Sequence, residues 1–245
     1  MTGPNTPHTW TRDGDIGILS LGASAGNYLA DPEFIPVHQA IGYFNEPGLK
    51  GVIIRGTGRH FSAGADMETL RKLAQDELLL AEKITAGKEL IRIIDGLHLP
   101  VVAEIRGACL GGGLEIALAC HIRICSDNAL FAFPEANHGI MPGLGGTATL
   151  SRLIGPGQAA GMILSGDVVN AEKALEIGLV DYVTGKDELQ AYTMRYLQKL
   201  TADRDIEVIR SVMASIHNSL YLPLDAAMLE ETKLFCALAA RNMKS

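Results

Sequence analysis

The residues of this sequence best suited to chemistry are a run of glycines and the acid that follows it. Gly111, Gly112 and Gly113 stand directly before the apolar helical pattern that starts at Leu114. A helix leaves its first N–H groups unpaired, and glycine, which has no Cβ, lets a ligand approach them closely. The run therefore predicts an oxyanion site at a helix start. Glu115 follows three residues after Gly112, on the same face of the helix.

A second acid, Glu135, stands twenty residues after Glu115 and directly follows Pro134. Two close carboxylates push their pKa values apart, so that one group holds a proton while the other accepts one. Beside an oxyanion site, such a pair is suited to acid–base chemistry next to a carbonyl. Structural alternatives are a partly buried structural role for Glu115 and a turn-capping role for Glu135. An unpaired carboxylate among apolar neighbours is unfavourable, which argues against the first alternative.

Other reactive side chains near these motifs have plainer interpretations. His60 precedes a glycine-containing loop, and His138 could orient Glu135, three residues before it. Cys109 has no evident histidine base beside it, so the sequence does not favour a thiolate nucleophile. Asp66 has two interpretations of equal weight: a substrate contact, or the N-cap of the helix that follows it.

The elements that must position these residues alternate between strands and helices. The predicted strands are Asp15–Leu21, Val52–Ile54, Val101–Ile105, Ile122–Cys125, Leu130–Phe133 and Val180–Val183. The predicted helices are Glu33–Phe44, a region from Met67 whose longest piece is Glu77–Ile94, Gly145–Leu153, Gln158–Leu164, and a short helix capped by Asn170 and ended by Gly178. After Gly185 the chain is predicted to be helical to its end, with Pro223 as the main break. Repeated strand and helix units imply an α/β core.

Composition excludes several classes of protein. With 47% hydrophobic and 20% charged residues over 245 positions, the chain can bury a full core and lacks the charge excess of disorder. A net charge of −7 argues against a nucleic-acid partner. No apolar run is long enough for a membrane span. The polar start of the chain lacks the apolar core of a secretory leader, and the four cysteines show no C-x-x-C spacing. We therefore expect a cytoplasmic protein with reduced thiols.

Three motifs together resemble one family. They are H-F-S-A-G-A-D at 60–66, G-A-C-L-G-G-G-L-E-I-A at 107–117 and P-E-A-N-H-G-I-M-P-G-L-G-G at 134–146. With the trailing L-S-G-D and A-L-E-I-G-L-V-D-Y-V, they resemble the crotonase (enoyl-CoA hydratase/isomerase) family. The likeness runs from about residue 50 to 184 without a large gap.

The resemblance implies a fold and an assembly. The fold is a crotonase-like spiral of ββα units, an α/β architecture, with a C-terminal helical trimerisation region. Residues 1–184 would form the core domain with the active site, and residues 185–245 the helical region. The assembly would be a homotrimer or a dimer of trimers.

The resemblance also implies an activity and a set of site residues. The activity is that of an enoyl-CoA hydratase of fatty acid metabolism, reversible as a 3-hydroxyacyl-CoA dehydratase. Its substrate is an acyl-CoA or another acyl thioester, with coenzyme A as part of the substrate and no metal or redox cofactor. The backbone N–H groups of Ala65 and Gly112 would form the oxyanion hole, Glu115 would activate water and Glu135 would deliver the Cα proton. The residues implied to bind substrate are Ala63, Asp66, Met67, Gly111, Leu114, Met141 and Pro142.

Three alternative functions stay open. A Δ3-Δ2 enoyl-CoA isomerase would share the fold and use Glu135 as a proton shuttle, but retention of both acids favours hydration. A dehydratase acting on a carrier-protein-bound thioester is the second alternative. The third is a non-catalytic acyl-thioester-binding subunit, which would have little use for two acids.

One stretch departs from the family pattern. Only Asn27 and Leu29 echo the family's Asn-Ala-Leu segment, and no Lys or Arg occurs between Arg12 and Lys50. Contacts to coenzyme A phosphates are therefore not predicted from this side. The candidate phosphate contacts on other loops are Arg59, Arg71, Lys72 and Arg106.

Overall fold

Two β-sheets form the strand framework of the protein. The computed structural model describes residues 8–22 and 25–243. Within these residues the larger sheet has the spatial order β1 (His8–Asp13), β2 (Ile16–Leu21), β3 (Gly51–Gly56), β4 (Val101–Ile105), β6 (Ile122–Ser126) and β9 (Tyr182–Thr184). The smaller sheet has the order β5 (Ala108–Leu110), β7 (Leu130–Ala132) and β8 (Val169–Asn170). In the larger sheet β1 and β2 are antiparallel, and all other neighbours are parallel.

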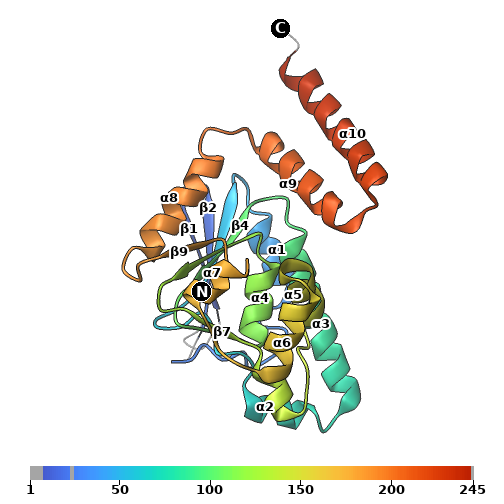
Figure 1. The fold of residues 1–245 in the computed structure, drawn as a ribbon. Coiled ribbons are helices and arrows are strands. Elements are labelled where there is room, and N and C mark those ends of the chain that lie inside the picture. Colours follow the sequence, from blue (N-terminus) through green and yellow to red (C-terminus); the bar gives the residue numbers. More distant parts are fainter. Residues whose placement is uncertain (1–7, 23–24, 244–245) are drawn as a thin grey trace.

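Helices cover both faces of the larger sheet (Figure 1). The helices of the described residues are α1 (Val37–Phe44), α2 (Met67–Leu73), α3 (Glu77–Asp95), α4 (Gly112–Ala119), the 3₁₀ helix η1 (Pro134–His138), α5 (Gly146–Ile154), α6 (Pro156–Ser165), α7 (Ala171–Glu176), α8 (Leu189–Thr201), α9 (Ile206–Tyr221) and α10 (Leu224–Asn242). On one face, Ile54 and Ala103 belong to the main core with buried residues of α1, α3 and α4. On the other face, Ile53 and Val102 pack with Leu197 of α8. None of the described helices is both long and apolar enough to cross a bilayer.

The central strands owe their position to continuous apolar runs. Val52, Ile53 and Ile54 in β3 are all buried, as are Val101 and Val102 in β4. Such runs are typical of parallel strands that are covered on both faces, and polar alternation is typical of strands covered on one face only. The two strands are parallel and adjacent, as this pattern requires.

The structure differs from the sequence-based expectations in several strands and in the start of one helix. The predicted strands at 122–125 and 130–133 lie in different sheets, because β6 pairs with β4 and β9 whereas β7 pairs with β5 and β8. Strands β1, β5 and β8 are absent from the predicted set. Helix α1 begins at Val37 and not at Glu33, because the backbone of Pro36 is extended (ψ 127°). The polar chain start at 1–7, residues 23–24 of the predicted loop and residues 244–245 lie outside the described residues.

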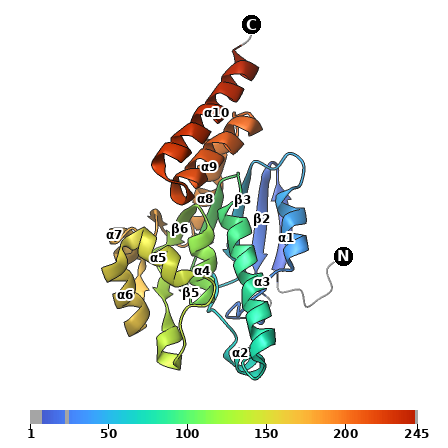
Figure 2. The same cartoon turned by 90° about the vertical axis from the view of Figure 1, so that its right-hand side faces the viewer.

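The C-terminal helices form a layer of their own. Figures 1 and 2 show α9 and α10 side by side beyond one end of the larger sheet. Their fully buried residues are few, Ile209 in α9 and Ala227 in α10. The Tyr221 hydroxyl donates to Asp95 Oδ2 at 2.5 Å, which attaches the end of α9 to the end of α3. The predicted helical character after Gly185 is present, and the division into two domains at residue 184 stays a prediction.

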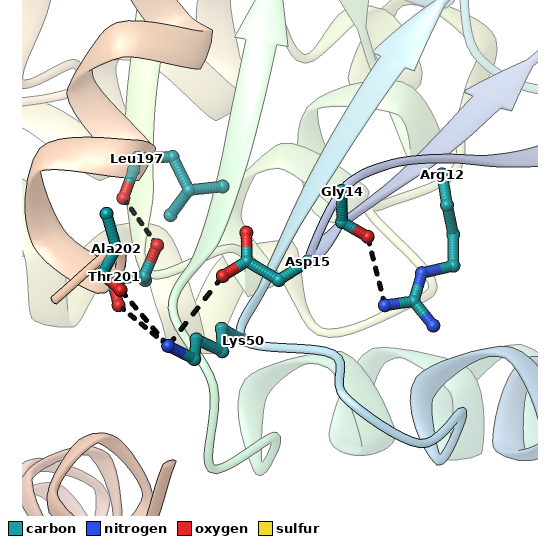
Figure 3. A network of polar contacts seen from close by, with 7 residues as sticks. All are labelled: Arg12, Gly14, Asp15, Lys50, Leu197, Thr201 and Ala202. Atoms are coloured by element: carbon teal, nitrogen blue, oxygen red, sulfur yellow. Dashed lines mark hydrogen bonds and ion pairs between the residues drawn. The ribbon is translucent and has the colours of Figure 1, made fainter. Parts of the chain in front are cut away.

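Helix α8 is attached to the strand framework by a polar network at its C-terminal end (Figure 3). Lys50 Nζ donates to the carbonyls of Thr201 (3.5 Å) and Ala202 (3.2 Å) and lies 3.8 Å from Asp15 Oδ2. The last carbonyls of a helix lack partners within the helix and carry partial negative charge. The lysine therefore links the end of α8 to the turn that precedes β2.

Candidate active site

The loop at 60–66 lies directly against β5 and the start of α4. Ser62 and Cys109 form a parallel bridge, in which Leu110 N donates to Ser62 O at 2.9 Å and Ser62 N donates to Ala108 O at 3.1 Å. A Cβ on Gly64 would lie 2.8 Å from Leu110 O, and a Cβ on Gly113 would lie 2.7 Å from Ser62 Cβ. The two motifs can approach this closely only because glycine occupies both positions.

Two backbone N–H groups at this junction have no hydrogen-bond partner in the described part of the chain. In the bridge between Leu29 and Ala65, Leu29 N donates to Gly64 O and Asp66 N donates to Leu29 O, both at 2.9 Å. The N–H of Ala65 takes no part in it. Gly112 is the first residue of α4, so its N–H has no partner within the helix. Neither N–H donates to another of the described residues.

The left-handed glycine of the run is Gly111, with φ +50°, whereas Gly112 has no positive φ. A Cβ on Gly111 would also lie 2.6 Å from Glu135 Oε1. A Cβ on Gly112 would meet Leu29 Cδ1 at 3.0 Å, and a leucine methyl can move. The backbone conformation therefore requires glycine most strongly at Gly111, one residue before Gly112, whose N–H is the proposed oxyanion donor.

Glu115 is held in one orientation inside the protein. It is 3% exposed, and its Oε1 accepts hydrogen bonds from Leu144 N and Gly146 N, both at 2.7 Å. Burial raises the pKa of this carboxyl, while the Gly146 and Leu144 amides oppose the rise. The two amides stabilise the charged form, so Glu115 is suited to be the ionised member of a pair.

Glu135 lies in η1 and is less constrained. Its Oε2 is buried and has no hydrogen-bond partner among the described residues. Burial, with a smaller contribution from the charge of Glu115, raises the pKa of Glu135 to about 7. The N–H of Glu135 itself opposes this rise, but no other donor among the described residues stabilises the charged form, whereas two amides stabilise that of Glu115. The pair is therefore unequal, as a general acid and a general base require.

Both carboxylates line one cavity of about 350 Å³, together with Ala65 and Gly112. Most of its wall is apolar, and no lysine or arginine is among the described residues that line it. Other apolar residues of the wall were not predicted from the sequence. They lie in α2, in α3, in the segment before α2 and in the segment after η1: Tyr28, Leu29, Leu70, Leu73, Leu80, Ile84 and Leu144. Leu80 and Ile84 are spaced by four residues in α3, which places them on one helix face and is the signal that could have indicated them.

The remaining predicted substrate contacts divide into two groups. Ala63, Asp66, Met67, Gly111 and Met141 line the cavity. Leu114 and Pro142 do not; both are buried, and Leu114 belongs to the main core. Successive helix residues are rotated by about 100°, so Leu114 and Glu115 lie on different sides of the helix.

The weaker candidates have defined structural roles or positions. Asp66 is the N-cap of α2, since its side chain accepts from Thr69 N at 2.8 Å, and it also lines the cavity. His60 Nδ1 accepts from Ala108 N at 3.0 Å, which supports the loop and not the cavity. His138 lies at the cavity wall and is exposed. Cys109 is completely buried, and burial raises the pKa of its thiol far above the ordinary value.

Comparisons of the sequence give one consistent result. The sequence model of the family described as enoyl-CoA hydratase/isomerase matches residues 31–244. A probable enoyl-CoA hydratase from Bacillus subtilis (strain 168) is 36% identical over 193 residues, which cover 78% of this chain and 73% of that protein. A crotonyl-CoA hydratase from Syntrophomonas wolfei subsp. wolfei is 34% identical over 213 residues, which cover 86% of this chain and 81% of that protein.

The fold is also shared with solved structures. The enoyl-CoA hydratase from Bacillus anthracis superposes with a TM-score of 0.84 at 27% identity, covering 94% of this chain and 89% of that one. The predicted α/β fold class, with strand and helix units followed by C-terminal helices, is confirmed by this likeness.

Proposed function

This chain belongs to the enoyl-CoA hydratase/isomerase family, and from that premise we propose that it is a hydro-lyase that adds water across the α,β double bond of an acyl thioester. The observation that carries the proposal is the placement of Glu115 and Glu135 on one cavity with the free N–H groups of Ala65 and Gly112. The reverse reaction is the dehydration of a 3-hydroxyacyl thioester.

The two N–H groups bind the thioester carbonyl oxygen. When the water oxygen bonds to Cβ, the electrons of the double bond move towards the carbonyl, and the oxygen becomes negative as in an enolate. Two fixed donors stabilise that charge more than they stabilise the neutral carbonyl, and losing one such donor typically lowers the rate about a hundredfold or more. The apolar wall strengthens these hydrogen bonds because it excludes water.

The carboxylates move the two protons. Glu115, ionised and fixed by two amides, takes a proton from the attacking water. Glu135, protonated near neutral pH, gives its proton to Cα. The products are the 3-hydroxyacyl thioester, a protonated Glu115 and an ionised Glu135, so one proton then returns between the two groups through solvent. This chemistry needs only the protein's own groups, and we propose that no metal or redox cofactor takes part.

An assay with two substrates tests the proposal. Purified protein is incubated with crotonyl-CoA and, separately, with a 3-enoyl-CoA, while the absorbance of the conjugated thioester and the product masses are followed. Hydration removes the absorbance of crotonyl-CoA and adds the mass of one water. Conversion of the 3-enoyl-CoA to its conjugated isomer without a mass change would assign the isomerase alternative. Binding of both without conversion would assign the non-catalytic alternative.

The residues that line the cavity are compatible with the alternative substrate, a thioester bound to a carrier protein. No cation lines the cavity among the described residues, and the candidate phosphate contact Lys72 is paired with Glu68 at 2.7 Å. A thioester held mainly by its acyl and pantetheine parts would fit such a site. Crotonyl-CoA and crotonyl-pantetheine should then have kcat/KM values within about tenfold of each other. A much larger preference for crotonyl-CoA would show that its nucleotide is recognised.

The pH dependence follows from the single proton that the pair must hold. Hydration starts with the proton on Glu135 and ends with it on Glu115, so both directions need the same singly protonated pair. Because the pKa of Glu135 is about 7, that proton is lost as the pH rises through about 7. We expect kcat/KM to fall above that pH by about tenfold per unit, equally for hydration and dehydration. Initial rates in both directions check this, and an alkaline limb in only one direction would contradict it.

We also propose threefold assembly through the C-terminal helices. Several large apolar side chains of α9 and α10 are more than half exposed in the single chain: Leu220, Leu224, Met228, Leu229 and Phe235. Exposed apolar surface of this extent marks an interaction site. Analytical ultracentrifugation should give the mass of a homotrimer or of a dimer of trimers. A stable monomer at assay concentrations would refute the assembly.

A further inference from the structure

Asn27 has an unusual backbone conformation for its residue type. Its φ is +49°, which makes it the sole non-glycine residue with positive φ among the described residues. It is 1% exposed, although asparagine is normally a surface residue. A left-handed, buried, polar residue persists only where its surroundings hold it in place, and such residues gather at functional sites.

The side chain of Asn27 binds the segment that leads into the loop at 60–66. Its Nδ2 donates to Thr57 O and His60 O, both at 2.8 Å, and its Oδ1 accepts from Thr57 Oγ1 at 3.1 Å. Two carbonyl oxygens at one end of the amide fix that end as the donor. One buried amide group thus closes the turn before the loop.

The backbone of Asn27 continues the connection towards Ala65. Ser62, which is completely buried, donates its hydroxyl to Asn27 O at 2.8 Å. The same hydroxyl oxygen accepts from Gly64 N at 3.2 Å. Gly64 immediately precedes Ala65, whose N–H has no partner among the described residues. A chain of hydrogen bonds therefore runs from Asn27 to the residue before that N–H.

We propose that Asn27 is the positioning residue of the oxyanion hole, acting through Ser62 to fix the direction of the Ala65 N–H. The proposal rests on the proposed hydration of a thioester at this cavity. Asn27 does not line the main cavity and touches no reacting atom in this scheme. It fixes the direction of the Ala65 N–H. That donor stabilises the negative carbonyl oxygen of the transition state only if it already points towards it before the charge forms.

The test separates the side chain of Asn27 from its backbone. Asn27→Gly keeps the left-handed conformation accessible and removes only the amide. The matched control is Asn45→Gly, which removes a similar hydrogen bond from Asn45 Nδ2 to Ile41 O (2.9 Å) at the exposed end of α1. Each protein is assayed for kcat and KM with crotonyl-CoA. Each is also titrated with 4-(dimethylamino)cinnamoyl-CoA, whose absorption moves to longer wavelength when its carbonyl is polarised.

For Asn27→Gly we expect kcat and kcat/KM to fall together by at least about tenfold, with KM changed less than about threefold, because the interaction lost is one made in the transition state. The red shift of the bound cinnamoyl thioester should shrink. Asn45→Gly should match the wild type in both. Wild-type turnover or a full red shift in Asn27→Gly would overturn the proposal, the latter even if kcat had fallen.

If Asn27→Gly does not fold, the proposal is tested with Ser62→Ala, which keeps Asn27 and removes the hydroxyl that connects it to Gly64. A smaller red shift in that variant supports the proposal and an unchanged one overturns it. The red shift needs no turnover. If the wild-type protein did not hydrate crotonyl-CoA, the proposed function would be refuted. The red shift of the bound cinnamoyl thioester in the variants would still test the role of Asn27.

Discussion

Replacing Glu115 by glutamine is expected to lower kcat for hydration by about a hundredfold or more, because the general base is lost. The glutamine carbonyl can still accept from Leu144 N and Gly146 N, so the fold and thioester binding should survive. Stopped-flow or steady-state rates with crotonyl-CoA measure the first effect, and circular dichroism with ligand titration measures the second.

Glu104→Gln is the matched control for this change. Glu104 is likewise 3% exposed, and burial raises its pKa. It shares a strand face with Val102, which packs against α8, and its Oε1 lies 4.0 Å from Arg55 Nη1. Its variant should keep a hydration rate within about twofold of the wild type. Near wild-type turnover in Glu115→Gln would refute the two-acid scheme.

Combining Glu115→Gln with Glu135→Gln should lower the rate far less than the product of the single losses.

The second large effect is expected at Ala65. Ala65→Pro removes the N–H that we assign to the oxyanion hole, and turnover should fall by at least about a hundredfold. That N–H makes no hydrogen bond to the described protein, so its removal breaks none of the bonds that hold the loop to Leu29. Ala65→Ser keeps the N–H and should retain most of the activity.

The matched pair is compared by steady-state kinetics and by thermal denaturation. The proline also restricts Gly64, which has φ +88°, so the melting temperature shows whether the loop tolerates the change. An active Ala65→Pro enzyme would show that this N–H is not an oxyanion donor. An inactive Ala65→Ser enzyme would show that the side chain matters at this position.

The parts of the site that could be predicted are those that depend on local chemistry. A glycine run before an apolar helix and two acids are visible as residue types, and the structure brings Glu115 and Glu135 to one cavity. The left-handed position within the run could not be assigned, because three consecutive glycines look alike until the backbone is known. Likewise, Leu114 and Met141 are both apolar, and only packing shows that the first is core and the second lines the cavity.

The parts that could not be predicted depend on contacts between distant segments. Strand β5 is only three residues long and lies among glycine-rich motif residues, so no periodicity marks it. Strands β6 and β7 are neighbours in sequence but pair with strands from other parts of the chain. Asn27 echoed a family segment, yet its link to Ser62 spans 35 positions and has no local signature.

The four cysteines differ in exposure, so that thiol chemistry can label the protein at a single position. Cys109, Cys120 and Cys125 are buried, and burial raises the pKa of Cys120 and of Cys125 to about 12, so their thiols are protonated and shielded from reagents. Cys236 is exposed on α10. A disulfide reagent such as Ellman's should therefore modify no native thiol other than Cys236, and all four after denaturation. A single dye attached there would report on the C-terminal helices alone.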